Sequence, residues 1–192
     1  MQHLNRVDGS ISWAAVSYTW GDERAQELVP LSDAHEQKSP RPIQFIRNLH
    51  DILSHIAKMR RSHRHEERWS GWFWIDALCI MQDDEHPEKD IQIKFMPEIY
   101  GGACEVIARI GPGDSIIDAA IRYIRNQPPT FLRAVAERTA EARLESFELI
   151  FRDVAFCVRD IFKKSYWGRL WILQELAMVK ITTIVCGKEE LP

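Results

Sequence analysis

One glutamate lies in a mainly apolar segment, where burial of a carboxylate costs free energy. Residues 168–176 read GRLWILQEL, so Glu175 sits among mainly apolar residues. A surface helix usually supplies such a glutamate with a cation three or four residues away. The residues at these offsets are Trp171, Ile172, Met178 and Val179. Because a buried charge without a partner is strongly unfavourable, Glu175 either performs chemistry in a partly closed site or pairs with an arginine from another element, such as Arg109 or Arg169.

A second group of polar residues follows the apolar run at 11–18. Its candidates for ligand binding are Ser17, Tyr18, Trp20, Gly21 and Asp22. A hydroxyl and an aromatic ring bind polar and flat groups, and glycine lets the backbone approach a ligand closely. The aspartate accepts a ligand hydroxyl or caps the next segment. The alternative is a packed turn in which Trp20 covers the end of the sheet.

Two further residues have a binding and a structural interpretation. Asp76 interrupts the apolar run WFWIDALCI at 72–80, where its carboxylate needs a partner. It either holds a neighbouring loop or binds a ligand. Trp171 either stacks on a ligand ring or packs in the core.

The composition argues against several classes of function. The formal net charge is −3, so no general basic field indicates a nucleic-acid partner. No apolar run approaches the roughly 18 residues of a membrane span, and the N-terminus lacks the apolar core of a signal peptide. The four cysteines are spaced singly, without the pairs typical of a metal site. We therefore expect a cytoplasmic protein with free thiols and no metal centre.

The pattern of apolar segments predicts an α/β fold. Strands are expected near 13–18, 73–79, 105–110 and 181–186, separated by helices or long loops. This order favours a mainly parallel sheet with helices on both faces. Such a sheet binds ligands at the carboxyl ends of its strands, where the polar residues after the first strand and the helix with Glu175 would meet.

The segments between the strands have patterns of their own. Proline and polar residues predict irregular structure over 26–42, and apolar residues at helical spacing predict a helix over 45–59. Pro97 should divide the helix that precedes the third strand. Asp114 or Ser115 is a candidate N-cap. Residues 131–164 should be helical throughout.

Four blocks of this sequence, taken in order, resemble the fungal heterokaryon-incompatibility (HET) domain. They are AAVSYTWGD (14–22), WIDALCIMQDD (74–84), MPEIYGGACEVIARIG (96–111) and SYWGRLWILQELA (165–177). The resemblance spans nearly the whole chain and implies a single domain over residues 1–192, cut from a longer protein with regulatory or sensor regions. The chain departs from the family pattern at Met81, Pro97 and Arg109, where the family usually has asparagine, no proline and tryptophan.

Two of these blocks are also similar to TIR domains, which have a flavodoxin-like sheet. SYTWGDER (17–24) is similar to the block after the first TIR strand, and WILQEL (171–176) is similar to a plant TIR block whose glutamate is catalytic in NAD hydrolysis. This resemblance implies that Glu175 is the catalytic residue, that NAD is a consumed substrate rather than a bound cofactor, and that residues 131–164 form a helical insertion. A carboxylate stabilises the oxocarbenium-like cation that forms when the nicotinamide–ribose bond breaks.

Two functions therefore remain open. The first is a cell-death effector that hydrolyses NAD to nicotinamide and an ADP-ribose product when it self-associates. The second is a non-catalytic, oligomerising signalling module that triggers cell death through partners. An open cleft at Glu175 favours the first function, and a carboxylate sealed against an arginine favours the second. Tryptophans near loops, namely Trp69, Trp72 and Trp167, are the expected surface for self-association.

Overall fold

The architecture was obtained as a computed structural model of the whole chain. It describes residues 6–7, 10–21, 29–31, 41–43, 46–62, 71–82, 88–126 and 159–192. Among these residues, no helix is long and apolar enough to cross a membrane.

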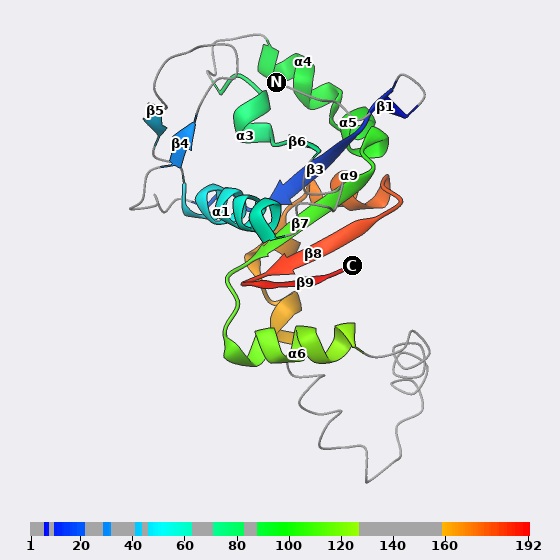
Figure 1. Cartoon of the computed structure of the whole chain (residues 1–192). Helices are drawn as coiled ribbons and strands as arrows, with labels where there is room; N and C mark the ends of the chain where they lie inside the picture. Colours follow the sequence, from blue (N-terminus) through cyan, green and yellow to red (C-terminus); the bar gives the residue numbers. More distant parts are fainter. Residues whose placement is uncertain are drawn as a thin grey trace, which may run out of the picture.

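A five-stranded sheet forms the centre of the described fold, in the order β6-β3-β7-β8-β9 (Figure 1). The strands are β3 (Trp13–Tyr18), β6 (Trp72–Trp74), β7 (Glu105–Gly111), β8 (Thr182–Cys186) and β9 (Glu189–Leu191). The first four are parallel, and β9 returns antiparallel to β8. Counted along the chain, the parallel strands lie in the order 2-1-3-4. This agrees with the first four positions of the flavodoxin-like order 2-1-3-4-5, so the expected α/β class with a mainly parallel sheet is confirmed.

One face of the sheet is covered by helix α1 (Arg47–Ser62). Its buried apolar residues, Leu49, Ile52 and Ile56, recur every three or four positions and therefore form one stripe. The stripe packs on alternate residues of the strands. Alternation in a strand sends neighbouring side chains to opposite faces, and for this reason the α1 side receives Val16 and Tyr18.

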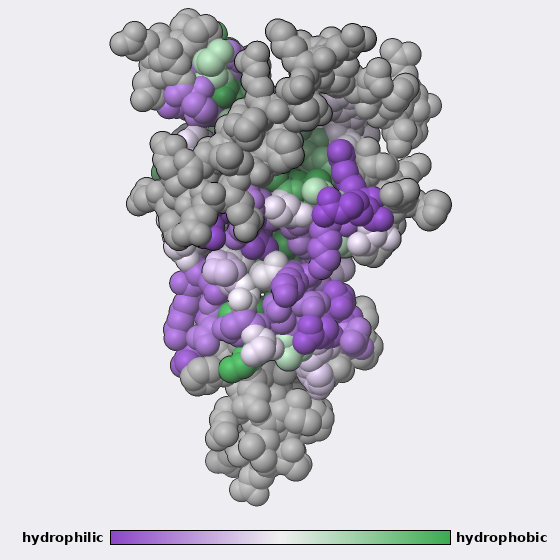
Figure 2. All heavy atoms as spheres, turned by 60° about the vertical axis from the view of Figure 1, so that its left-hand side comes forward, coloured by the Kyte–Doolittle hydropathy of each residue, from purple (hydrophilic) through white to green (hydrophobic). Residues whose placement is uncertain are grey.

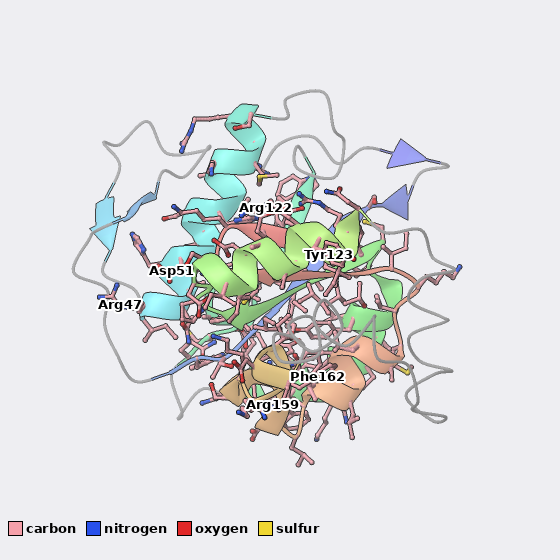
Figure 3. The ribbon with its side chains drawn as sticks, turned by 90° about the horizontal axis from the view of Figure 1, so that it is seen from below. Arg47, Asp51, Arg122, Tyr123, Arg159 and Phe162 are labelled. Carbon is pink, nitrogen blue, oxygen red and sulfur yellow. The ribbon has the colours of Figure 1, made fainter. Side chains whose placement is uncertain are left out.

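The opposite face is covered by several shorter elements. They are α5 (Met96–Gly102), α6 (Ser115–Arg125), the 3-10 turn η1 (Ser165–Gly168) and α9 (Ile172–Ala177). Tyr100 of α5 is buried and donates a hydrogen bond from its hydroxyl to the Val16 carbonyl at 3.1 Å. Seen from below, α1 with Arg47 and Asp51 lies on one side of the sheet, and the segment with Arg159 and Phe162 lies on the other (Figure 3).

Several predicted boundaries are confirmed. Strand β3 has the predicted bounds, and β7 and β8 differ from theirs by one residue. Helix α1 (47–62) overlaps the helix predicted over 45–59 but begins two residues later and ends three residues later. Asp114 is the N-cap of α6, because its carboxylate accepts hydrogen bonds from the amides of Ile116 and Ile117. Helix α4 (Glu88–Lys94) ends before Pro97, and Pro97 then lies in the first turn of α5.

Two predictions are wrong in part. The strand expected at 73–79 ends at Trp74, and α3 (Asp76–Cys79) follows. The amides of Leu78 and Cys79 bond the Ile75 carbonyl at 2.9 and 2.8 Å, which closes a helical turn where we expected a strand. Segment 26–42, expected to be irregular, contains strand β4 (Val29–Leu31) and the start of β5 (Arg41–Ile43), which pair antiparallel.

The remaining structural predictions fall largely outside the described residues. A small hairpin of β1 (Arg6–Val7) and β2 (Ser10–Ile11) precedes the sheet. Of the helical insertion expected at 131–164, residues 131–158 lie outside the described part, and residues 159–162 are helical.

Candidate functional site

The predicted site lies at the carboxyl end of β3, the strand at which the order of the sheet changes direction. The chain runs from β3 to β6 on one side and then returns to β7 on the other side. This change of direction is the place where doubly wound sheets bind their ligands. Ser17 and Tyr18 are the last two residues of β3, and Trp20 and Gly21 follow at once.

Glu175 is held by Arg169 and Ser17. The Arg169 guanidinium donates from Nη2 to Glu175 Oε1 at 2.6 Å and from Nη1 to Oε2 at 3.0 Å. The Ser17 hydroxyl donates a short hydrogen bond to Oε2. Both oxygens are therefore occupied, and the residue is only 1% exposed. This bidentate pairing gives the strongest hydrogen bonding between an arginine and a carboxylate.

Tyr166 completes this group of four side chains. Its hydroxyl lies 2.6 Å from Ser17 Oγ, and the Arg169 guanidinium carbon lies 5.5 Å from the centre of its ring. Burial raises the pKa of the Tyr166 hydroxyl above its ordinary range, so this group remains protonated at neutral pH. Because the single Ser17 proton goes to Glu175, Tyr166 is the donor to Ser17. We call Ser17, Tyr166, Arg169 and Glu175 the Glu175 cluster.

In this conformation, the geometry favours the structural interpretation of Glu175. The carboxylate is sealed against Arg169, one of the two arginines considered as partners, and does not face an open cleft. Arg109, the other, donates to the Gly187 carbonyl at 2.6 Å and faces Asp51 at 3.6 Å. Burial lowers the pKa of the Arg109 guanidinium.

Trp20 and Asp76 form a second contact at the same edge of the sheet. The Trp20 indole donates to Asp76 Oδ2 at 2.7 Å, while Oδ1 accepts from the Ala77 amide at 2.7 Å. Burial and then the nearby Asp76 carboxylate raise the pKa of the Tyr18 hydroxyl above its ordinary range. That hydroxyl has no hydrogen-bond partner of ordinary geometry among the described residues. Asp76 thus holds the loop after β3, as its structural interpretation required.

The other predicted site residues do not join the Glu175 cluster. Tyr18 packs on the α1 side, opposite to Ser17. Gly21 has a φ of 69°, which favours glycine, and Trp171 is 43% exposed at the N-cap of α9. Asp22 lies outside the described residues.

Sequence reasoning did not identify Tyr166 at all and treated Arg169 only as a possible partner. Helical spacing gave no signal for Arg169, because it precedes α9 in an extended conformation and reaches Glu175 from six positions away. Both residues lie in SYWGR (165–169), which belongs to a block that carries the family resemblance. Within the described part of the chain, no group of three or more His, Cys, Asp or Glu side chains is placed to hold a metal ion.

The structure describes two of the three tryptophans that were expected to form a surface for self-association. Trp167 is partly buried, donates to the Ile161 carbonyl at 2.9 Å and packs on Phe162. Trp72 is partly buried in β6, and Trp69 lies outside the described residues. The exposed apolar residues of this region are instead around α9.

Comparison with known proteins agrees with the order of the motifs. The family model described as "Heterokaryon incompatibility protein (HET)" matches residues 13–175, more than four fifths of the chain. The chain is 25% identical over 199 residues to "Heterokaryon incompatibility protein 6, OR allele" of Neurospora crassa. That alignment covers 92% of this chain but 29% of the relative, so the chain spans less than a third of the relative's length. No solved structure matches. The extent of the family match shows that this chain belongs to the heterokaryon incompatibility (HET) family.

Proposed function

We propose that this chain is a cell-death effector domain of fungal heterokaryon incompatibility and that it signals by self-association. Membership of the HET family supports the role in incompatibility. The single observation that favours a non-catalytic module is the sealed Glu175: both carboxylate oxygens are bonded within the protein, and the side chain is 1% exposed. Because the relative is more than three times as long as the matched part, regulatory or sensor regions outside this domain are part of the proposal.

The outer face of α9 is the proposed surface for self-association. A helix on the surface of a soluble protein normally buries apolar residues and exposes charged ones. Here Glu175 is buried, whereas Leu170 is 80%, Leu173 70% and Trp171 43% exposed. We call Leu170, Trp171 and Leu173 the α9 apolar surface. Exposed apolar groups of this kind mark interaction sites.

The side of the molecule that carries α1 differs from this surface. Figure 2 turns that side forward, and its coloured residues are mostly hydrophilic, with small and separate hydrophobic areas.

A pair of charge insertions tests this proposal. Leu173→Lys places an ammonium in the α9 apolar surface, and Ile116→Lys places the same charge at a 68% exposed position on α6. We expect L173K to abolish self-association, measured by light scattering over a range of concentrations, and to abolish cell killing in a fungal host. The matched I116K variant should retain both. Killing by L173K at the wild-type level would contradict the proposal.

NAD cleavage is the second candidate, and the position of the Glu175 cluster favours it. The cluster joins η1, α9 and the carboxyl end of β3 at the switch in strand order, the usual place of a ligand site. Catalysis would require Arg169 to leave Glu175, after which the carboxylate could stabilise the positive charge that develops on the ribose. NAD is then a substrate, and no cofactor takes part.

Nicotinamide release separates the two candidates. The purified domain would be incubated with NAD below and above the concentration at which it assembles. Release that appears only with assembly and disappears in Glu175→Gln supports NAD cleavage. Killing of host cells by a variant that assembles but releases no nicotinamide supports the non-catalytic module.

A further inference from the structure

The two members of the Arg169–Glu175 ion pair are buried unequally. The Arg169 side chain is 19% exposed, and that of Glu175 is 1% exposed. Arg169 lies between Gly168, whose added Cβ would meet no atom within 4 Å, and Leu170, which is 80% exposed. Glu175 instead belongs to α9, which is anchored by the buried Ile172. The pair therefore opens by outward movement of Arg169, with Glu175 left in place.

The Arg169 guanidinium occupies a site that is built for a cation. Glu175 supplies the negative charge on one side, and the Tyr166 ring faces the guanidinium at 5.5 Å on another. Aromatic faces attract cations of this size, whether they come from a side chain or from a ligand. The Ser17 hydroxyl donates directly to Glu175, and Arg169 Nη1 donates to the same hydroxyl at 3.3 Å, so the guanidinium contacts both residues of the cation site.

Opening of this pair leaves a buried carboxylate that needs a new partner and a guanidinium that is free to bind an anion. Glu175 remains in the core, where an unpaired carboxylate is strongly unfavourable. Arg169 moves to the mouth of the site, where its planar group of donors matches a phosphate. A ligand with only one charge satisfies only one of these residues. A ligand with an anionic phosphate group and a fixed cation satisfies both.

We propose that the Glu175 cluster binds its ligand by ion-pair exchange: phosphate replaces Glu175 at Arg169, and a cationic ring replaces Arg169 at Glu175. The inference rests on the second proposed function, because the oxidised nicotinamide dinucleotide has both groups, a pyrophosphate and a pyridinium ring. The reduced dinucleotide has the pyrophosphate but no cation, and ADP-ribose lacks the ring altogether. The exchange therefore selects the oxidised dinucleotide over both.

Equilibrium binding to the unaltered domain tests the exchange. Oxidised dinucleotide, reduced dinucleotide and ADP-ribose would be titrated separately by calorimetry, below and above the concentration at which the domain assembles. We expect the oxidised form to bind at least tenfold more tightly than the other two. Equal affinities for the three ligands, or no binding of any of them, would overturn the proposal. Because this series uses the unaltered protein, its result does not depend on the folding of a variant.

Two variants assign the two halves of the exchange. Glu175→Gln should bring the affinity ratio of oxidised to reduced dinucleotide close to one. Arg169→Gln should weaken all three ligands by a similar factor, because all three carry the pyrophosphate. A tenfold preference that survives in E175Q would remove Glu175 from the cation site and overturn the exchange.

Selective binding and nicotinamide release are measured separately, so the ion-pair exchange and NAD cleavage can each be refuted without the other. Tenfold selective binding without nicotinamide release would refute NAD cleavage and leave the exchange intact. Nicotinamide release without selective binding would refute the exchange and leave NAD cleavage intact.

Discussion

Neutralising Glu175 gives a direct measure of its role in stability. Glu175→Gln preserves the shape of the side chain but removes the charge that compensates Arg169. Breaking a buried ion pair costs about 3–5 kcal/mol. We expect a loss near the lower limit, about 3 kcal/mol, because the 19% exposed guanidinium can turn toward water. For a domain of this size, that loss lowers the melting temperature by roughly 6–12 °C.

Removing the other partner should cost more. Arg169→Gln leaves a carboxylate that is 1% exposed and cannot reach water, so we expect a loss of about 4–5 kcal/mol. The double variant E175Q/R169Q contains two neutral amides and no buried charge. Its loss should be smaller than the sum of the two single losses by about 2 kcal/mol or more, which is the signature of residues in contact.

Urea and thermal unfolding, followed by circular dichroism, measure these effects. Arg122→Gln is the control, because it breaks an ion pair of the same 2.6 Å length with Glu189 in which the arginine is 50% exposed. That pair should contribute less than about 1 kcal/mol. If E175Q is as stable as the wild type or more stable, the carboxylate is an electrostatic liability of the kind found in active sites. The structural role would then be refuted, and NAD cleavage would become the leading function.

Three further predictions concern other parts of the fold. Gly187→Ala should lower the free energy of unfolding in urea by about 2–4 kcal/mol, because φ is +58° and the added Cβ would lie 2.7 Å from Gly113 Cα. Gly168→Ala is the control, because its Cβ meets no atom within 4 Å, and it should change stability by less than about 1 kcal/mol. Equal effects of the two substitutions would contradict this account. In native protein, maleimide should label the exposed Cys104 and spare the buried Cys186, whose thiol pKa is raised by burial, and peptide mapping would detect the reverse order. Burial raises the pKa of Tyr18, Tyr100 and Tyr166 above the ordinary value of 10.0, so the unfolded chain releases these protons at a lower pH than the folded chain. The free energy of unfolding should therefore be constant below pH 10 with respect to these groups and fall by up to roughly 4 kcal/mol per pH unit above it. Unchanged urea midpoints between pH 9 and 11 would disagree with this last expectation.

The central strands were predictable because their apolar runs are continuous. A parallel strand covered on both faces needs apolar side chains at nearly every position, and β3 is buried from Ala14 to Tyr18. Strand β7 is also buried from Glu105 to Ile110, although two charged residues, Glu105 and Arg109, interrupt its apolar residues. Such runs locate a buried strand from the sequence alone.

The strand boundary within WFWIDALCI was not predictable from the same signal. Its apolar character continues past Trp74, but the chain turns into α3 at Asp76. The carboxylate of Asp76 bonds the Ala77 amide and the Trp20 indole, and the second of these partners belongs to a loop 56 positions earlier. A contact over that distance in the sequence leaves no trace in local periodicity.

The buried face of the helix with Glu175 was likewise not predictable from local periodicity. Periodicity groups Leu170 and Leu173 apart from Glu175, but it does not say which group faces the core. Apolar burial alone would place the leucines inside. The structure places Glu175 inside, because Arg169 and Ser17 satisfy both of its oxygens there.

The choice of the buried face has a consequence for function. A buried ion pair is weak evidence for stability, since an apolar replacement of similar volume is often as stable. The fold therefore gains little from Glu175 that a leucine could not provide, while it leaves Leu170 and Leu173 in water at 80% and 70% exposure. Both costs fall on α9 and the two residues before it, beside the switch in strand order. A partner that covers the leucines, or a ligand that takes over the pair, would offset them, and for this reason we place the function of the domain at α9.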